Sequence, residues 1–226
     1  MAATHPMKLN KVWAVIPAYN EEGSIERVIE STRKHLSNIV VVDDGSTDKT
    51  TASAEKAKAV VLKHIVNLGK GAALKTGCDY AFRHNAEAVV VLDADAQHDP
   101  SEIPKFAKQL ESHDMVFGYR KYNKSMPWIL KFGNMVINKL TQMFYGINLR
   151  DTQCGYRAFT SKAYRKIRWQ ASDYSMESEM ITRAGKNRVK YVEVPIETIY
   201  GNKYKGTTIL DGIKIVFNLL WWRWSK

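Results

Sequence analysis

Cysteine is scarce in this sequence, which has only Cys78 and Cys154 among its 226 residues. Two thiols are too few for the disulfide framework of a small secreted domain, and they suit a reducing cytosol. The first ten residues lack the apolar core of a signal peptide, so we expect a cytoplasmic location. Long apolar runs are also missing, because three charged residues interrupt the most apolar stretch, 209–224, and a bilayer needs ~18 apolar residues. We therefore expect no segment that crosses a membrane.

The second half of the sequence is short of acidic residues. Residues 1–116 hold 14 basic and 16 acidic side chains, net −2, whereas residues 117–226 hold 20 basic and 7 acidic, net +13. A basic excess confined to one half favours an anionic partner, such as nucleic acid, phosphate groups or a membrane surface, over a charge bias without function. Hydrophobic residues make up 45% and charged residues 25%, which excludes a disordered or fibrous chain. The length fits a single domain, 1–226.

Short β-branched runs alternate with helix-like segments in the first half. Strands are predicted at 12–16, 39–42, 60–62, 88–92 and 115–118, and helices at 23–36, 48–58, 70–84 and 100–112, with N-caps from 46–48 and 99–101. This βαβα order predicts an α/β fold in which a mainly parallel sheet carries helices on both faces. In the second half we expect a loop at 119–127, helices at 128–145, 177–186 and 207–223, and strands at 154–159 and 189–199.

Polar motifs follow the first four predicted strands. Residues 17–22 read Pro-Ala-Tyr-Asn-Glu-Glu, 43–48 read Asp-Asp-Gly-Ser-Thr-Asp, 67–71 read Asn-Leu-Gly-Lys-Gly, and 93–98 read Asp-Ala-Asp-Ala-Gln-His. Ligands of open α/β sheets bind beyond the carboxyl ends of the strands. Because three of the four motifs carry carboxylates, we expect one functional site at this edge.

The motif at 93–98 predicts a metal site. Alternate residues leaving a strand can bring the carboxylates of Asp93 and Asp95 and the amide oxygen of Gln97 onto one hard cation. Such ligands suit Mg²⁺ or Mn²⁺, which keep positions open for substrate phosphates. An isolated Asp-x-Asp is also typical of a simple turn, and the three companion motifs favour the metal site.

Asp44 and Lys70 extend the prediction to a nucleotide. The carboxylate of Asp44 could accept the imino N–H of a base, although Asp-Gly is also an ordinary turn. The loop at 67–71 could bring its backbone and Lys70 close to the nucleotide. It matches neither GxxxxGK[ST] nor GxGxxG, which argues against an ordinary NTPase or dehydrogenase.

In this order, the four motifs resemble inverting glycosyltransferase family 2, which implies a GT-A (nucleotide-diphospho-sugar transferase) fold. Residues 151–159, which read Asp-Thr-Gln-Cys-Gly-Tyr-Arg-Ala-Phe, are similar to the acceptor segment of dolichyl-phosphate mannose synthase and related polyprenyl-phosphate glycosyltransferases. The likeness runs from about residue 12 to 214, nearly the whole chain. It implies transfer of a hexose (mannose or glucose) from a GDP- or UDP-linked sugar to dolichyl or polyprenyl phosphate.

The resemblance also implies roles for individual residues. The nucleotide-sugar site comprises Pro17, Tyr19, Glu21, Asp44, Lys70, Asp93, Ala94, Asp95, Gln97, Arg120 and Lys203. The acceptor site comprises Arg150, Asp151, Cys154 and Arg157. Asp95, Arg120 and Arg150 are the catalytic candidates, and Asp93, Asp95 and Gln97 the ligands of Mg²⁺ or Mn²⁺. Cys154 stands where the mannose synthases have serine, and Lys205 competes with Lys203 for contact with the diphosphate.

The charges fit this chemistry without the resemblance. A nucleotide diphosphate leaving group gains negative charge, which a divalent cation, Arg and Lys can stabilise. A lipid phosphate is already anionic, so it needs positioning rather than a strong base. A sugar hydroxyl of a saccharide or lipid-linked glycan is the alternative acceptor. It would need a base, for which Asp151, Glu177 and Glu179 are candidates, although the two glutamates could equally be surface carboxylates.

The end of the chain predicts contact with a membrane surface. Three of the six tryptophans lie at 221, 222 and 224, beside Arg223 and Lys226. Tryptophan and flanking basic residues favour the membrane interface, and the same helix, 207–223, would also dock on the core. We expect either peripheral binding at the cytosolic face or dependence on a membrane-anchoring subunit. A non-catalytic nucleic-acid-binding module is the remote alternative, and no nucleic-acid motif supports it.

Overall fold

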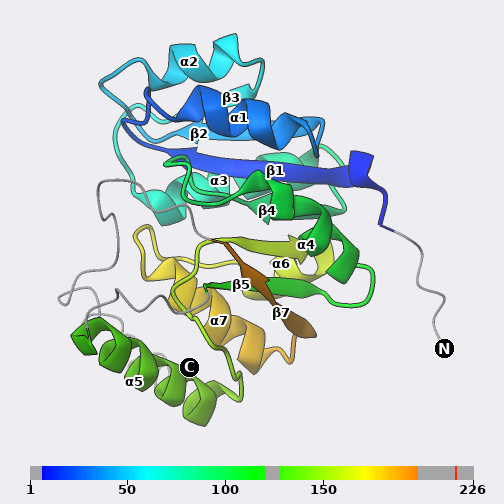
Figure 1. The fold of residues 1–226 in the computed structure, drawn as a ribbon, viewed down its shortest axis with the longest axis vertical. Coiled ribbons are helices and arrows are strands. Elements are labelled where there is room, and N and C mark those ends of the chain that lie inside the picture. The colour runs from blue at the N-terminus through cyan, green and yellow to red at the C-terminus, as the bar shows by residue number, and fades with distance from the viewer. Residues whose placement is uncertain (1–6, 121–127, 198–216, 218–226) are drawn as a thin grey trace.

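The computed structural model describes residues 7–120, 128–197 and 217, without the side chains of 128–134. In this part of the chain, one seven-stranded sheet carries packed helices (Figure 1). The strands are β1 (Val12–Ala18), β2 (Asn38–Asp43), β3 (Val60–Lys63), β4 (Ala88–Val91), β5 (Met115–Arg120), β6 (Arg157–Thr160) and β7 (Tyr191–Ile196). The helices are α1 (Ile25–Arg33), α2 (Thr50–Lys56), α3 (Lys70–Arg83), α4 (Ile103–Gln109), α5 (Trp128–Tyr145), α6 (Ser161–Ile167) and α7 (Met176–Lys186), with 3-10 turns η1 (Leu9–Lys11) and η2 (Pro100–Glu102).

The sheet is mainly parallel, as predicted, with one antiparallel strand. Its order is β3-β2-β1-β4-β6-β5-β7. The pairs among β1 to β4 are parallel, as is the pair of β5 with β7. Strand β6 runs antiparallel to both of its neighbours, β4 and β5, and its register sets Arg157 opposite Val91. A strand from late in the sequence therefore lies beside β4, the strand that leads into the motif at 93–98.

Apolar side chains on both faces bury the central strands. On β1, Ala14 and Ile16 face one core and Val15 faces the other, because successive side chains of a strand point to opposite faces. Helices α1 and α4 cover the first core, and α3, α6 and α7 cover the second (Figure 1). The prediction of helices on both faces is therefore confirmed.

Both predicted helix N-caps in the first half form hydrogen bonds. Asp99 accepts one from Ser101 N at 2.9 Å, although η2 rather than an α-helix starts there. Asp48 accepts one from Thr50 N at 2.9 Å just before α2, but the residue at the N-cap position is Lys49, so the cap predicted at 46–48 ends one residue too early. The sequence therefore located these two helix starts within a few residues.

The second half departs further from the prediction. The strand expected at 154–159 forms only from Arg157 onward, and the residues after it form the unexpected α6, with Thr160 as its cap. The helix predicted at 207–223 lies outside the described residues, as does most of the loop at 119–127. Among the helices that the structure describes, none is both long and apolar enough to span a membrane.

Helix α3 approaches the sheet closely at Gly77. A Cβ atom there would lie 2.5 Å from Val15 Cγ1 and 3.0 Å from Val42 Cγ2, both on buried strands. Valine is stiff at χ1, so neither methyl group can move aside without disturbing the sheet. The glycine therefore sets the distance between α3 and the strands.

We expect Gly77→Ala to lower the free energy of unfolding by about 1–3 kcal/mol, because the added methyl group overpacks the core. In an unobstructed helix the same change would stabilise by up to ~1 kcal/mol, so the sign of the effect reports the close contact. Urea unfolding measures it. Gly23→Ala is the matched control, since a Cβ at Gly23 would have no atom within 4 Å. Equal stability of the two variants would contradict this packing.

Candidate active site

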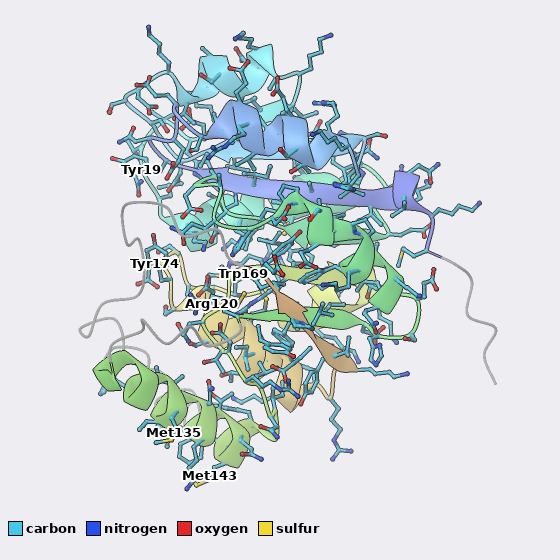
Figure 2. The ribbon with its side chains drawn as sticks, viewed as in Figure 1. Tyr19, Arg120, Met135, Met143, Trp169 and Tyr174 are labelled. Atoms are coloured by element: carbon cyan, nitrogen blue, oxygen red, sulfur yellow. The ribbon has the colours of Figure 1, made fainter. Side chains whose placement is uncertain are left out.

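A pocket of about 580 Å³ opens at the carboxyl ends of β1, β2 and β4. It is lined by eight of the predicted site residues: Pro17, Tyr19, Glu21, Asp44, Lys70, Asp93, Ala94 and Asp95. The remaining lining residues are Ala18, Asn20, Asn67, Gly69, Ala73 and Tyr174. Figure 2 shows Tyr19 and Tyr174 at the same edge of the molecule, from distant parts of the chain. Gln97 does not line the pocket, and Lys203 and Lys205 lie outside the described residues.

Asp44 anchors the loop that follows β3. Its carboxylate accepts hydrogen bonds from Leu68 N at 3.0 Å and Gly69 N at 2.8 Å, and its Oδ1 lies 2.6 Å from His64 Nδ1. The turn that presents Asp44 needs Gly45, whose φ is +75° and whose Cβ would lie 2.5 Å from the backbone of Val66. Asp44 therefore shapes the pocket wall, and contact with a base stays a prediction.

Four charged side chains meet at the pocket floor. Lys70 Nζ lies 2.8 Å from Asp93 Oδ1 and 3.2 Å from Glu177 Oε1. Burial alone would raise the pKa of Asp93, but the Lys70 ammonium outweighs it and lowers that pKa to about 2. Burial also raises the pKa of Asp95, and the negative charge of Asp93 adds to this shift. Asp95 is therefore a carboxylate that a further cation would stabilise.

The residues at this floor fit a divalent cation. Asp93 Oδ1 is buried and receives no well-aligned hydrogen bond, despite the nearby ammonium of Lys70. Within the described residues, no group of three or more His, Cys, Asp or Glu side chains could hold a metal. Two carboxylates are few ligands, which is usual for Mg²⁺ bound together with substrate phosphates and water. Coordination by Asp93, Asp95 and Gln97 stays a prediction.

A second pocket, of about 660 Å³, lies between the end of β5 and helix α5. It is lined by Tyr119, Arg120, Met135, Asn138, Lys139, Gln142, Asn148 and Arg150. Arg120 forms a two-point ion pair with Asp151, with Nε 2.7 Å from Oδ2 and Nη2 3.1 Å from Oδ1. The guanidinium of Arg150 donates to the Tyr119 hydroxyl at 2.8 Å and lies over that ring. The structure thus brings both predicted catalytic arginines, Arg120 and Arg150, to one pocket.

Two predicted acceptor residues face inward instead. Arg157 is 1% exposed and donates to the carbonyls of Thr152, Cys154 and Glu177 at 2.8–2.9 Å. Cys154 is buried, with Sγ 3.3 Å from the position of a Cβ at Gly118, and burial raises the pKa of its thiol to about 12. The structure places both side chains inside the protein, and their contact with an acceptor phosphate stays a prediction. Through its bonds to the carbonyls of Thr152 and Cys154, Arg157 holds the backbone of the segment 151–156 in place.

Neither candidate glutamate base is a surface residue. Glu179 accepts hydrogen bonds from Gln170 N and Ala171 N and pairs with Arg183 at 2.7 Å, so it caps the loop before α7. Glu177 is buried beside Lys70. Glu179 therefore holds that loop, and Glu177 pairs with Lys70, which lines the first pocket.

Sequence reasoning missed two histidines that contact aspartates of the site, His98 at the backbone of Asp93 and His64 at the carboxylate of Asp44. His98 Nδ1 accepts a hydrogen bond from Asp93 N at 3.1 Å, and burial lowers the pKa of His98 to about 4, so the ring is neutral. His64 contacts Asp44 and lies 3.0 Å from the Thr76 hydroxyl. Each histidine follows a predicted strand at the edge of the sheet where the site lies, and this position could have marked both as site residues. Nothing in the sequence pointed to Tyr174 as a lining residue.

Comparison with known proteins identifies the family. Residues 13–168 match the family model described as glycosyl transferase family 2. The chain belongs to glycosyltransferase family 2. It is therefore an enzyme, and the matched residues include all four motifs at the sheet edge.

Relatives of this glycosyltransferase align over nearly the whole chain. An uncharacterized protein of Methanocaldococcus jannaschii is 38% identical over 93% of this chain and 91% of its own length. The UDP-N-acetylglucosamine–dolichyl-phosphate N-acetylglucosaminyltransferase of Methanococcus voltae is 34% identical, over 95% of this chain and 97% of its own. The undecaprenyl-phosphate mannosyltransferase of Micrococcus luteus is 29% identical, over 82% of each chain.

Solved structures agree with the fold. Glucosyl-3-phosphoglycerate synthase of Mycobacterium tuberculosis, in complex with Mn²⁺, uridine diphosphate and phosphoglyceric acid, superposes with a TM-score of 0.74. The match covers 94% of this chain and 78% of that one, at 19% identity. The glycosyltransferase thus has the predicted GT-A fold.

The segment that precedes β6 lies directly against the carboxylate floor at Gly155. A Cβ there would lie 3.0 Å from Asp93 Oδ2 and 3.2 Å from Lys70 Nζ. We expect Gly155→Ala to weaken binding of UDP or GDP with Mn²⁺ by about tenfold, because the added methyl group pushes the Asp93 carboxylate and the Lys70 ammonium out of position by a few tenths of an ångström. Isothermal titration calorimetry measures the change. Gly23→Ala should bind as the parent chain does, and unaltered binding by Gly155→Ala would contradict a ligand site at Asp93.

Proposed function

We propose that this family 2 enzyme transfers a hexose, mannose or glucose, with inversion from a GDP- or UDP-linked donor to polyprenyl or dolichyl phosphate. The reaction would take place at the cytosolic face of a membrane. Residues 1–118 would supply most of the nucleotide-sugar site, and 119–206 the acceptor site. Residues 207–226 would contact the membrane surface, directly or with a membrane-anchoring subunit.

The main support for this proposal is that the three candidate bases are already paired with cations. Asp151 is paired with Arg120, Glu177 with Lys70, and Glu179 with Arg183 and backbone amides. Each carboxylate is thus already engaged, so none of the three is poised to remove a proton from a hydroxyl acceptor. An acceptor phosphate brings its own anionic oxygen and needs no base. This supports a phosphate acceptor over a saccharide hydroxyl.

The two pockets suit the two substrates. Arg120 lines the second pocket, and its charge is among the causes that lower the pKa of Asp93 in the first, so the pockets lie within electrostatic reach. Arg120 and Arg150 would hold the acceptor phosphate and direct one oxygen toward the anomeric carbon. Asp93, Asp95 and Gln97 would hold Mg²⁺ or Mn²⁺, which when bound stabilises the charge of the departing diphosphate. Lys70, at the same floor, would add to that stabilisation.

The names of two relatives support the acceptor class. The Methanococcus voltae enzyme is named for dolichyl phosphate and the Micrococcus luteus enzyme for undecaprenyl phosphate. The first is also named for UDP-N-acetylglucosamine, so a test of the donor should include that sugar beside GDP-mannose, UDP-glucose and GDP-glucose.

Transfer to lipid phosphate can be measured directly. The full chain is incubated with Mn²⁺ or Mg²⁺, each radiolabelled nucleotide sugar, and a short-chain polyprenyl phosphate or a saccharide acceptor. We expect labelled polyprenyl-phosphate sugar from one donor and no labelled saccharide. Asp95→Ala is the matched inactive chain, because it would remove a metal carboxylate. Product from a saccharide but from no phosphate acceptor would overturn the proposal.

Arg150→Ala should raise KM for polyprenyl phosphate about tenfold or more and change KM for the nucleotide sugar little, because a charge-assisted hydrogen bond to phosphate is lost. Steady-state kinetics with each substrate varied in turn separates the two constants. Arg165→Ala is the matched control, since Arg165 is exposed on α6 and lines neither pocket. An equal rise in both KM values would argue against an acceptor role for Arg150.

A further inference from the structure

Lys70 is a cation held between carboxylates from different parts of the chain. Asp93 follows β4, whereas Glu177 belongs to α7, and the Lys70 side chain between them is 17% exposed. The ring of Tyr174 lies 5.5 Å from Nζ on the pocket side.

The backbone of Lys70 is fixed at the start of α3. Gly69 has a φ of +96°, and a Cβ at Gly69 or Gly71 would lie 2.5 Å from the carbonyl oxygen of Ser172 or Ala171. Gly71 N donates to Ser172 O at 2.6 Å, and Trp169 Nε1 donates to Gly71 O at 2.8 Å. The loop before α7 thus clamps the helix end, and only the flexible side chain of Lys70 can move.

The ammonium of Lys70 lies where it would compete with a divalent cation for the carboxylate of Asp93. Its Nζ is 2.8 Å from Asp93 Oδ1, the oxygen that receives no well-aligned hydrogen bond. A divalent cation on this carboxylate would lie a few ångströms from the ammonium, and like charges at such distances repel appreciably even in a polar medium. A diphosphate beside both cations would relieve the repulsion, since its oxygens can accept the ammonium and ligate the metal.

We propose that Lys70 is the resident counter-ion of Asp93 and makes binding of the divalent cation depend on the nucleotide diphosphate. Without nucleotide, Lys70 neutralises Asp93 and disfavours the metal. With nucleotide, the ammonium turns from Asp93 to the phosphates while Glu177 keeps it within reach. The inference rests on the donor part of the proposed function and is independent of the acceptor.

Binding of Mn²⁺ to the full chain without nucleotide tests the first half of the inference. Free Mn²⁺ is followed by electron paramagnetic resonance for the parent chain and for Lys70→Met. We expect Lys70→Met to bind Mn²⁺ at least about fivefold more tightly, since a neighbouring positive charge is removed. Lys63→Met is the matched control, because it loses the same charge from an exposed position at the end of β3. Unchanged or weaker binding by Lys70→Met would overturn the proposal.

Two further variants test whether the tighter Mn²⁺ binding arises from the loss of the Lys70 charge at Asp93. Lys70→Met leaves Glu177 buried without its cation, so Lys70→Met/Glu177→Gln removes both charges and should show the same tighter binding if the single variant unfolds. Adding Asp93→Asn to Lys70→Met should abolish the gain, which assigns it to this carboxylate. Persistence of the gain without Asp93 would contradict the proposal.

The dependence on nucleotide is measured by repeating the titrations with saturating UDP and with GDP. In the parent chain the nucleotide that binds should tighten Mn²⁺ binding. In Lys70→Met this factor should shrink by about the gain seen without nucleotide, because the nucleotide-free affinity rises while the affinity with nucleotide, where Lys70 has left Asp93, does not. An equal factor in both chains would overturn the inference. These titrations contain no acceptor. If the transfer assay with polyprenyl phosphate fails, they still test the role of Lys70 at the donor site.

Discussion

Strand β6 forms its hydrogen bonds with β4 in a register that sets Arg157 opposite Val91, two residues before Asp93. The segment that leads into β6 must therefore pass the carboxylate floor, where Gly155 lies against Asp93, and reach β5, where Asp151 pairs with Arg120. A slip of one residue would turn every side chain of β6 to the opposite face of the sheet. Both pockets thus depend on one short antiparallel ladder.

Buried charges at the site divide into two groups by how they are compensated. Arg157 donates to three carbonyls, and Glu179 accepts from backbone amides and Arg183. The hydrogen-bonding groups of both residues are therefore satisfied inside the protein. Removing one partner of such a buried group is costly, which makes these residues supports of the loops rather than contacts of a ligand. Asp93 and Asp95 line the first pocket, and burial together with the charge of Asp93 raises the pKa of Asp95.

The sequence predicted the sheet and its functional edge because these depend on local signals. Continuous β-branched runs predicted β1, β2 and β4, and the motif after each run predicted which side chains line the pocket. It could not predict that β6 inserts beside β4, since pairing between distant segments leaves no local pattern. The direction of a side chain in an irregular segment is equally hidden. Arg150 directly precedes the motif at 151–159 and Arg157 lies within it, yet Arg150 is exposed and Arg157 is buried.

The two pockets also explain how two phosphate-bearing substrates would be kept apart. Asp93 and Asp95 make the first pocket repel a bare phosphate, so a nucleotide sugar enters favourably when a divalent cation or Lys70 offsets its charge. Arg120, Lys139 and Arg150 make the second pocket attract a phosphate without metal. Three of the 20 basic residues of 117–226, namely Arg120, Lys139 and Arg150, line this pocket. Substrate order and orientation would then follow from the sign of charge on either side of the segment before β6.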